Sequence, residues 1–269
     1  MKISNLKKLK PKKLIVFDID GTLTLTKAPM DPEMAKLMAQ LLAAKKVAVI
    51  GGGKYGLFKE QLAPLYRLKL SKQLLEKLFL FPSTATSFYR YNSGWKNIYA
   101  LQLSLAERNK VKKAFRTVLK EIGYAPKRVY GKMIEDRGTQ VTLSTLGQDV
   151  VAILGTKRGV ALKTKWAKEN RELKMKIGRM VAKLVPELEV HVAGFTSIDV
   201  TKKGIDKAYG LKQIQKYVHV PIKDMLFVGD AIFPGGNDYA VVRTGVDYVP
   251  VTGPEQTKEI IRAVLEKPE

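Results

Sequence analysis

The chain has 269 residues, 45% of them apolar, and it contains no cysteine. That length suits one large domain or two modest ones. The lack of cysteine excludes disulfides, thiolate metal sites and thiol catalysis, and two histidines, His191 and His219, are too few for a histidine-rich metal site. No stretch approaches the roughly 18 consecutive apolar residues that a membrane span requires. We therefore expect a protein of the cytoplasm with no membrane partner.

The formal net charge of +23 admits nucleic acid, anionic membranes or anionic small molecules as partners. The lysines and arginines are spread along the chain, however, and no nucleic-acid-binding motif accompanies them. We expect most of this charge to be solvated surface, with part of it attracting a phosphorylated small molecule. A nucleic-acid partner is not expected.

The first part of the chain predicts alternating strands and helices. Asp31 suits an N-cap and Pro32 the first turn of a helix that continues to about residue 44. Three short apolar runs lie at 14–17, 47–50 and 78–81. Such runs are typical of buried strands in a parallel sheet.

A glycine run follows the second of these strands. Gly51, Gly52 and Gly53 precede Lys54, and a helix is expected from about Tyr55. A strand, a glycine loop and a helix in this order aim backbone N–H groups at an anion. A plain tight turn explains the glycines equally well.

The pattern then changes to that of an α+β insert. Ser104 and Glu107 form a capping box ahead of a helix. The other elements expected in the insert are a strand at 138–145, a helix at 168–185, and strands at 188–192 and 196–200. The βα alternation returns with helices at 205–217 and 255–266 and strands at 225–230 and 248–251. We expect one discontinuous α/β domain, 1–87 and 201–269, interrupted by a second domain at 88–200.

Two carboxylates follow the first strand, Asp18 and Asp20. The carboxyl end of a strand is where an open α/β sheet places its active site. Two carboxylates so close repel each other unless a cation lies between them or one holds a proton, and Mg²⁺ prefers such oxygens. Asp18 could then bind the metal and attack phosphorus, with Asp20 as general acid and base. A turn capped by aspartates is the alternative for an isolated pair.

A second acidic cluster follows a later strand. The strand expected at 225–230 ends in Asp230, and Asp238 follows after a loop. Asp230 would be a third oxygen source for Mg²⁺, beside the side chain of Asp18 and the backbone carbonyl of Asp20. Asp238 would orient a metal-bound water or Asp230 itself. A loop with Asx turns is the plainer alternative.

Lys207 supplies the positive charge that the acidic motifs lack. It lies near the start of the helix expected at 205–217, between the two motifs in sequence. A phosphoryl group in transfer needs cations around its oxygens, and lysine is a suitable point charge. Taken alone, it is an ordinary helix lysine.

Four segments in this order resemble the core of the haloacid dehalogenase superfamily of phosphatases and phosphomutases. They are Asp18-Ile-Asp-Gly-Thr22, Gly51-Gly-Gly-Lys54, Lys203-Gly-Ile-Asp-Lys207 and the stretch from Gly229 to Asp238. The resemblance implies a Rossmann-like parallel-sheet core with an inserted α+β cap of type IIB (C2b). It also implies that Asp18 is the nucleophile, that Asp20 is the acid and base, and that Mg²⁺ is the cofactor.

Three further segments, two in the expected insert and one in the core, are similar to those of the α-phosphomannomutases and related hydrolases of this superfamily. They are Asp136-Arg-Gly138, Ser197-Ile-Asp-Val200 and the Phe-Pro-Gly-Gly-Asn-Asp-Tyr stretch that begins at Phe233. The resemblance implies that Arg137 holds a distal phosphate, that Ser197 and Asp199 contact sugar hydroxyls, and that Lys27 replaces an arginine that reaches phosphate. It further implies a homodimer formed through the cap.

The chain departs from that pattern in two places. The core hydroxyl expected after the strand at 47–50 is absent, so the amides of Gly52 and Gly53 and the side chain of Lys54 would have to bind phosphate instead. In the cap, a mutase arginine is replaced by Gln148. Losing an arginine fork weakens the grip on phosphate, and a mutase must bind a sugar bisphosphate in two orientations.

These departures favour a Mg²⁺-dependent phosphatase of sugar phosphates over a mutase. The alternative is a phosphomannomutase that interconverts mannose 1-phosphate and mannose 6-phosphate. A third hypothesis is a non-catalytic anion or nucleic-acid binder on the same fold, motivated by the net charge and the missing hydroxyl.

Overall fold

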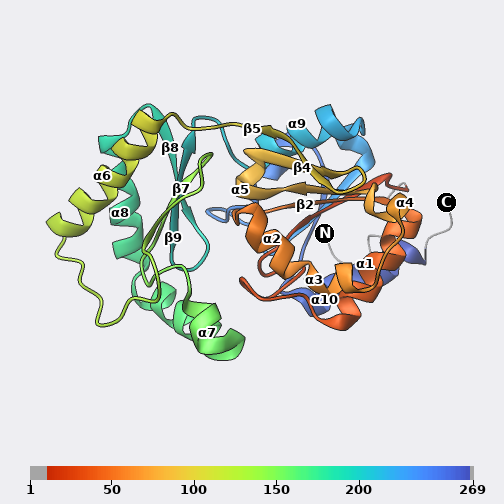
Figure 1. The fold of residues 1–269 in the computed structure, drawn as a ribbon, viewed down its shortest axis with the longest axis horizontal. Coiled ribbons are helices and arrows are strands. Elements are labelled where there is room, and N and C mark those ends of the chain that lie inside the picture. The colour runs from red at the N-terminus through yellow and green to blue at the C-terminus, as the bar shows by residue number, and fades with distance from the viewer. Residues whose placement is uncertain (1–10, 267–269) are drawn as a thin grey trace. The chain divides into compact units, whose positions relative to one another are not determined.

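A computed structural model describes residues 11–266 of the chain. The chain forms two compact units (Figure 1). The first consists of Met1–Ala100 and Asp206–Glu269, and the second of Leu101–Ile205. Among the described residues, no helix is both long enough and apolar enough to span a membrane.

The first unit is built on a seven-stranded sheet in the order β11-β10-β1-β2-β3-β4-β5. The five strands from β11 to β3 are parallel, and β4 and β5 are antiparallel additions at one edge. The strands are β1 (Leu14–Asp18), β2 (Lys46–Ile50), β3 (Leu78–Phe81), β4 (Ser87–Tyr91), β5 (Trp95–Ala100), β10 (Met225–Gly229) and β11 (Asp247–Pro250). The predicted α/β class with a parallel sheet is confirmed.

Helices cover both faces of this sheet, which is why its central strands are apolar throughout. The helices of the first unit are α1 (Pro32–Ala44), α2 (Tyr55–Gln61), α3 (Ala63–Arg67), α4 (Lys72–Leu75), α5 (Pro82–Ala85), α9 (Lys207–Val218) and α10 (Pro254–Leu265), with 3₁₀ turns η2 (Ile222–Asp224) and η3 (Tyr239–Thr244). Ile15 and Phe17 of β1 belong to the core beneath α1, α2, α3 and α10. Leu14 and Val16 belong to the core beneath α9.

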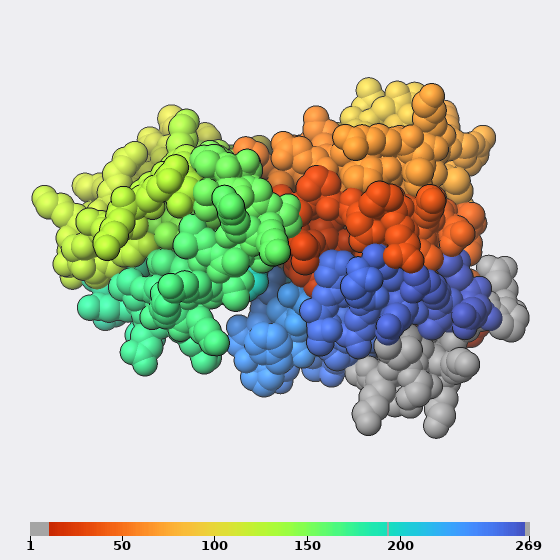
Figure 2. Space-filling model, turned by 90° about the horizontal axis from the view of Figure 1, so that it is seen from below, coloured from red at the N-terminus to blue at the C-terminus, as the bar shows by residue number. Residues whose placement is uncertain are grey.

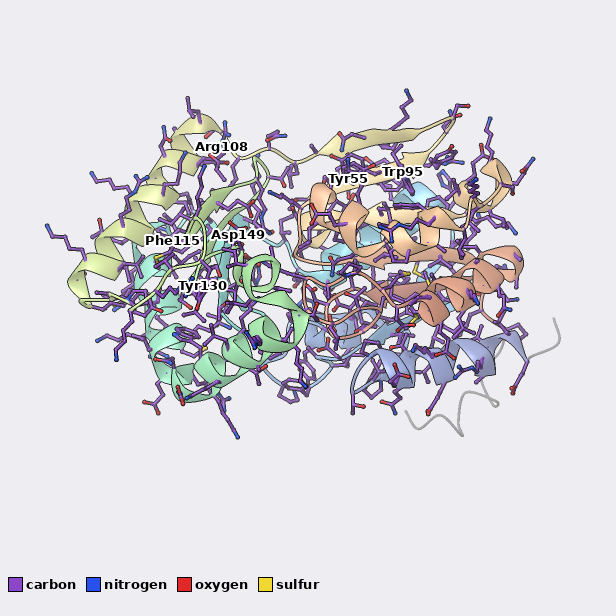
Figure 3. The ribbon with its side chains drawn as sticks, turned by 60° about the horizontal axis from the view of Figure 1, so that its bottom comes forward. Tyr55, Trp95, Arg108, Phe115, Tyr130 and Asp149 are labelled. Carbon is purple, nitrogen blue, oxygen red and sulfur yellow. The ribbon has the colours of Figure 1, made fainter. Side chains whose placement is uncertain are left out.

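The β4–β5 hairpin moves the first domain boundary away from the position that the sequence analysis expected. Residues 88–100 were assigned to the insert, but β4 pairs with β3, so they belong to the first unit. Aromatic stacking ties the hairpin to that unit, since the Tyr55 and Tyr89 rings lie 3.7 Å apart and Trp95 contacts Tyr66 (Figure 3). Similarly, 201–205 belong to the second unit. The tyrosine-rich composition hid the strand alternation.

The second unit packs two helices on a four-stranded antiparallel sheet in the order β6-β7-β9-β8. Its elements are α6 (Leu105–Glu121), β6 (Ile134–Asp136), β7 (Val141–Ser144), α7 (Val150–Glu169), α8 (Arg171–Leu184), β8 (Leu188–Ala193) and β9 (Ser197–Lys202). The capping box expected at Ser104 and Glu107 is present at the start of α6. Phe115 of α6 lies in the apolar core between the helices and the sheet (Figure 3).

Helix α7 was not predicted. It carries Gly155 at a left-handed φ of 75° and a second glycine, Gly159, so the helical periodicity is interrupted. At its start, Asp149 donates from its backbone N to the carbonyl of Tyr130 at 2.9 Å (Figure 3). A glycine-interrupted helix stabilised by such contacts gives little local signal.

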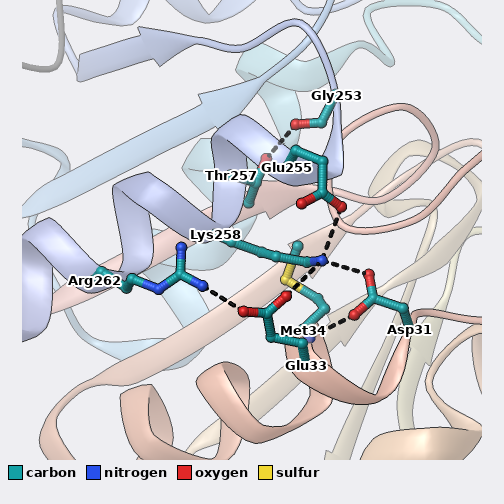
Figure 4. A network of polar contacts seen from close by, with 8 residues as sticks. All are labelled: Asp31, Glu33, Met34, Gly253, Glu255, Thr257, Lys258 and Arg262. Atoms are coloured by element: carbon teal, nitrogen blue, oxygen red, sulfur yellow. Dashed lines mark hydrogen bonds and ion pairs between the residues drawn. The ribbon is translucent and has the colours of Figure 1, made fainter.

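An ion-pair cluster joins α1 to α10, helices from opposite ends of the sequence that lie side by side (Figure 2). The Lys258 ammonium contacts Asp31 at 3.0 Å, Glu33 at 3.0 Å and Glu255 at 2.8 Å (Figure 4). Asp31 is also the predicted N-cap of α1, where it accepts from Met34 N at 2.9 Å. The cluster therefore anchors the end of the loop that follows Asp20.

Candidate active site

Acidic side chains from distant parts of the chain meet at the carboxyl edge of the first unit's sheet. Asp18 ends β1, and Asp230 directly follows β10, the parallel strand paired with β1. Together with Asp238, each offers a carboxylate oxygen within 4.8 Å of the other two. Adjacent parallel strands end at the same edge, which explains why these residues converge.

Lys207 lies between two of these carboxylates. It is 2% exposed, and its Nζ donates to Oδ1 of Asp18 and to Oδ1 of Asp238. The N-cap of α9, Asp206, accepts from Tyr209 N at 2.9 Å and fixes the first turn of the helix that presents the lysine. Because the lysine occupies Oδ1 of Asp18, Oδ2 is the oxygen that could attack phosphorus.

The buried cluster carries more negative than positive charge. Burial raises the pKa of Asp230 to about 6, with Asp238 adding to the effect and Lys207 opposing it. Burial likewise raises the pKa of Asp18 well above its ordinary value, although Lys207 acts against it. Burial alone would lower the pKa of Lys207, but Asp18 and Asp238 outweigh it and raise that pKa. Three carboxylates around one ammonium thus favour an added cation.

This donor set fits Mg²⁺, which binds carboxylate oxygens in preference to nitrogen or sulfur. Asp238 is fully buried, and its Oδ2 accepts from Ala231 N at 3.1 Å. It is therefore held as an acceptor in the loop that follows Asp230. Of the residues that were expected to hold Mg²⁺ or orient its site, the structure brings together Asp18, Asp230 and Asp238.

Asp20 is fixed by its own loop. Its Oδ1 accepts from the backbone N of Lys27 at 2.7 Å. The backbone of Lys27, at a left-handed φ of 55°, thus holds this carboxylate. The contact of the Lys27 side chain with phosphate stays a prediction. Gly21 allows the tight turn directly after Asp20, because its φ is +83° and a Cβ would lie 2.4 Å from Oδ2 of Asp230.

The glycine run at the end of β2 is constrained by packing. A Cβ at Gly51 would lie 2.6 Å from Cγ2 of Ile19, and the Gly51 amide donates to Phe81 O at 3.3 Å. A Cβ at Gly53 would meet only the far end of Leu57, at 3.0 Å. A hydroxyl-bearing residue is therefore sterically excluded at 51 but nearly accommodated at 53. Lys54 is the exposed N-cap residue of α2.

In the second unit, Arg137 lies in the turn between β6 and β7, and Gln148 lies in the loop after β7. The Arg137 Nε donates to Glu135 at 2.8 Å, and the arginine side chain is 7% exposed. Gln148 is half-buried, and its backbone N donates to Lys132 O at 3.0 Å. Arg137, the residue expected to hold a distal phosphate, thus already shares its charge with a carboxylate.

Ser197 and Asp199 lie on the same face of β9, two residues apart. Asp199 is buried, and its Oδ1 accepts from Thr142 of the neighbouring β7 at 2.8 Å. Thr142 in turn accepts from Gln140 at 2.9 Å. Gln140, Thr142 and Asp199 therefore form a buried hydrogen-bonded chain, and β9 is paired on both sides and is not an edge strand.

Sequence reasoning missed Gln61. It is fully buried, and its Nε2 donates to Asp20 at 2.9 Å and to Thr24 at 2.8 Å. A polar residue at the end of a short helix gives no local signal for this contact. Only the approach of α2 to the loop after β1 produces it.

Residues 34–267 match the family described as eukaryotic phosphomannomutase. The phosphomannomutase of Spinacia oleracea is 28% identical over 273 residues, which cover 97% of this chain and 99% of that protein. The IMP-bound, N-terminally truncated IMP-nucleotidase of Plasmodium falciparum is similar in structure, with a TM-score of 0.67 at 15% identity over 98% of this chain and 70% of that one. A structure from a "phosphoryl-transfer superfamily" has a TM-score of 0.59 at 15% identity, over 94% and 99%. These structural likenesses show the fold, a haloacid dehalogenase core with a cap.

Proposed function

Because the chain belongs to the eukaryotic phosphomannomutase family, we propose that it interconverts mannose 1-phosphate and mannose 6-phosphate by phosphoryl transfer through Asp18. The observation that carries the proposal is the buried cluster of Asp18, Asp230, Asp238 and Lys207. The sequence analysis favoured hydrolysis, but the family match over most of the chain supports isomerisation better.

In the proposed reaction, Oδ2 of Asp18 attacks phosphorus and forms an O–P bond while the sugar ester P–O bond breaks. Asp20 gives a proton to the departing sugar oxygen. In the second half, Asp20 takes the proton from the accepting sugar hydroxyl as that oxygen bonds to phosphorus and the bond between Asp18 and phosphorus breaks, which restores the Asp18 carboxylate. Lys207 holds Asp18 in place and adds positive charge beside the phosphoryl oxygens.

Asp18, Asp230 and the backbone carbonyl of Asp20 would hold Mg²⁺, with Asp238 orienting the site. When bound, Mg²⁺ would neutralise part of the charge on the transferred phosphoryl group. The amides of Gly52 and Gly53 and the side chain of Lys54 would bind phosphate from the end of β2.

The second unit would select the substrate. Ser197 and Asp199 offer polar groups for sugar hydroxyls, and Arg137 and Gln148 offer donors for the phosphate that is not transferred. The fixed position of Asp199 supports this assignment, because a side chain already held by Thr142 loses little freedom on binding.

Phosphatase activity is the second candidate. The glutamine at 148 and the glycine at 53 favour it, because both remove groups that would hold a phosphate during reorientation of a bisphosphate. A hydrolase needs only one phosphate and a water.

One experiment decides between the two. Mannose 1-phosphate is supplied with Mg²⁺, with and without a catalytic amount of hexose 1,6-bisphosphate, and mannose 6-phosphate and inorganic phosphate are followed together. The mutase predicts isomer formation that increases with the bisphosphate. Phosphate release without isomer would refute isomerisation and leave hydrolysis. Undiminished turnover by Asp18→Asn would refute both.

A further inference from the structure

Gln61, the last residue of α2, lies against the loop that carries Asp20 and takes no part in the reaction described above. Its side chain has no exposed surface, and all its described polar contacts lie within the first unit. Nε2 donates to Oδ1 of Asp20 at 2.9 Å and to Oγ1 of Thr24 at 2.8 Å. A buried amide whose two donors both reach one loop restrains that loop.

The neighbouring hydroxyl determines which way the amide points. Thr24 donates its own hydroxyl proton to the carbonyl of Ile19, at 3.3 Å, and so offers Gln61 a lone pair. An ionised carboxylate can only accept. Both partners therefore require N–H groups, and Gln61 must present Nε2 to them and not its carbonyl oxygen.

Asp20 consequently has two distinct oxygens. Oδ1 accepts from Gln61 and, at 2.7 Å, from the backbone N of Lys27. Neither amide can take up a proton, so a proton on Oδ1 would face two N–H groups and no acceptor. The acid form of Asp20 therefore carries its proton on Oδ2.

We propose that Gln61 is a positioning residue that fixes the Asp20 carboxylate so that Oδ2 exchanges the proton with the sugar oxygen. The inference rests on the proposed function. As the sugar P–O bond breaks, the Oδ2 proton passes to the departing oxygen. In the second half a proton returns to Oδ2 from the accepting hydroxyl as the new sugar O–P bond forms and the bond between Asp18 and phosphorus breaks. Met30 N also donates to the backbone carbonyl of Gln61 at 2.9 Å, so the backbone and the side chain of Gln61 both contact the loop between β1 and α1.

A substrate whose leaving group needs no proton distinguishes this positioning role from a purely structural role of Gln61. In Gln61→Met, which keeps the length of the side chain but has no N–H, we expect the first turnover with mannose 1-phosphate to slow about tenfold or more, because general acid–base catalysis contributes roughly 10²–10⁴-fold. The first-turnover burst of p-nitrophenolate from p-nitrophenyl phosphate should stay within about twofold, since that anion leaves without protonation. KM should be unchanged for both substrates.

A second variant guards against a folding defect. Thr24→Val keeps the shape of the side chain but removes the acceptor that orients Gln61, so it should cause the same selective loss to a smaller extent. Gln213→Met, a half-buried glutamine on α9, is the matched control and should change neither rate.

Equal losses on both substrates in Gln61→Met and Thr24→Val, or no loss on either, would overturn the role of Gln61. Thermal unfolding of each variant shows whether an equal loss follows from instability. Full activity of Asp18→Asn would overturn the proposed function instead, so the two failures are distinguishable.

Discussion

The two units bury lysine side chains in opposite ways. In the first, Asp18 and Asp238 flank Lys207 and raise its pKa despite burial. In the second, Lys174 donates to the carbonyl of Gly194 at 2.5 Å, and burial lowers its pKa to about 8 although Asp199 acts in the opposite direction. The first unit balances buried charge with charge, as phosphoryl transfer requires. At Lys174 in the second unit, burial outweighs the effect of the nearby carboxylate.

Removing Lys207 should have the largest effect. Lys207→Met leaves two carboxylates buried without their ammonium, so we expect the free energy of unfolding to fall by about 3–5 kcal/mol. Phosphoryl transfer should fall by at least about a hundredfold. Urea denaturation and initial rates measure the two effects. Lys212→Met, at an exposed position of the same helix, is the control and should be neutral.

Lys174 should make stability depend on pH in a way that Lys207 does not. Its folded pKa, about 8, lies below the ordinary value of 10.5, so the unfolded chain binds more protons between these pH values. Stability should therefore rise from about pH 8 to about pH 10.5, by up to about 3 kcal/mol.

Lys174→Met should abolish that rise, and Lys176→Met, at an exposed position of the same helix, should preserve it. Denaturation curves of the three proteins across this pH range provide the measurement. The same slope in Lys174→Met as in the original chain would contradict the assignment.

Gly21→Ala tests whether the acidic cluster needs its present spacing. The new Cβ would displace Asp230, and a shift of about 1 Å at a catalytic group can cost roughly a hundredfold in rate. The Mg²⁺ concentration needed for half-maximal rate should rise as well. Gly245→Ala is the matched control, because its φ is +74° but nothing lies within 4 Å of the new Cβ. It should lose stability from strain and keep its activity.

The smallest expected effect is a gain in the second unit. Gln148→Arg restores a cation for the phosphate that is not transferred, and a charged hydrogen bond of about 1.5 kcal/mol would lower KM for mannose 1-phosphate about tenfold. Isomer formation relative to phosphate release should increase too. Thr164→Arg adds the same charge at an exposed position and should change neither. An unchanged product ratio in Gln148→Arg would remove Gln148 from the phosphate site.

Much of the fold was predictable because its signals are local. The buried strands at 14–17, 47–50 and 78–81, the N-cap at Asp31 and the capping box at Ser104 depend on neighbours in sequence. The hairpin at 87–100 was missed as part of the core sheet because its tyrosine-rich strands, SFYRY and WKNIYA, show no regular alternation and join the sheet only through β3. Helix α7 was missed because its glycines break the periodicity.

By itself, the sequence determined the class of the fold, the order of the acidic motifs and the family, since each depends on residue types at short spacings. The tertiary structure alone decided which atoms meet. It placed Lys207 between two carboxylates, turned the backbone N–H of Lys27 toward Asp20, paired Arg137 with Glu135 and brought Gln61 to the Asp20 carboxylate. These contacts join segments whose relative positions follow from chain packing, and the angle of one side chain toward another is not encoded in any local pattern.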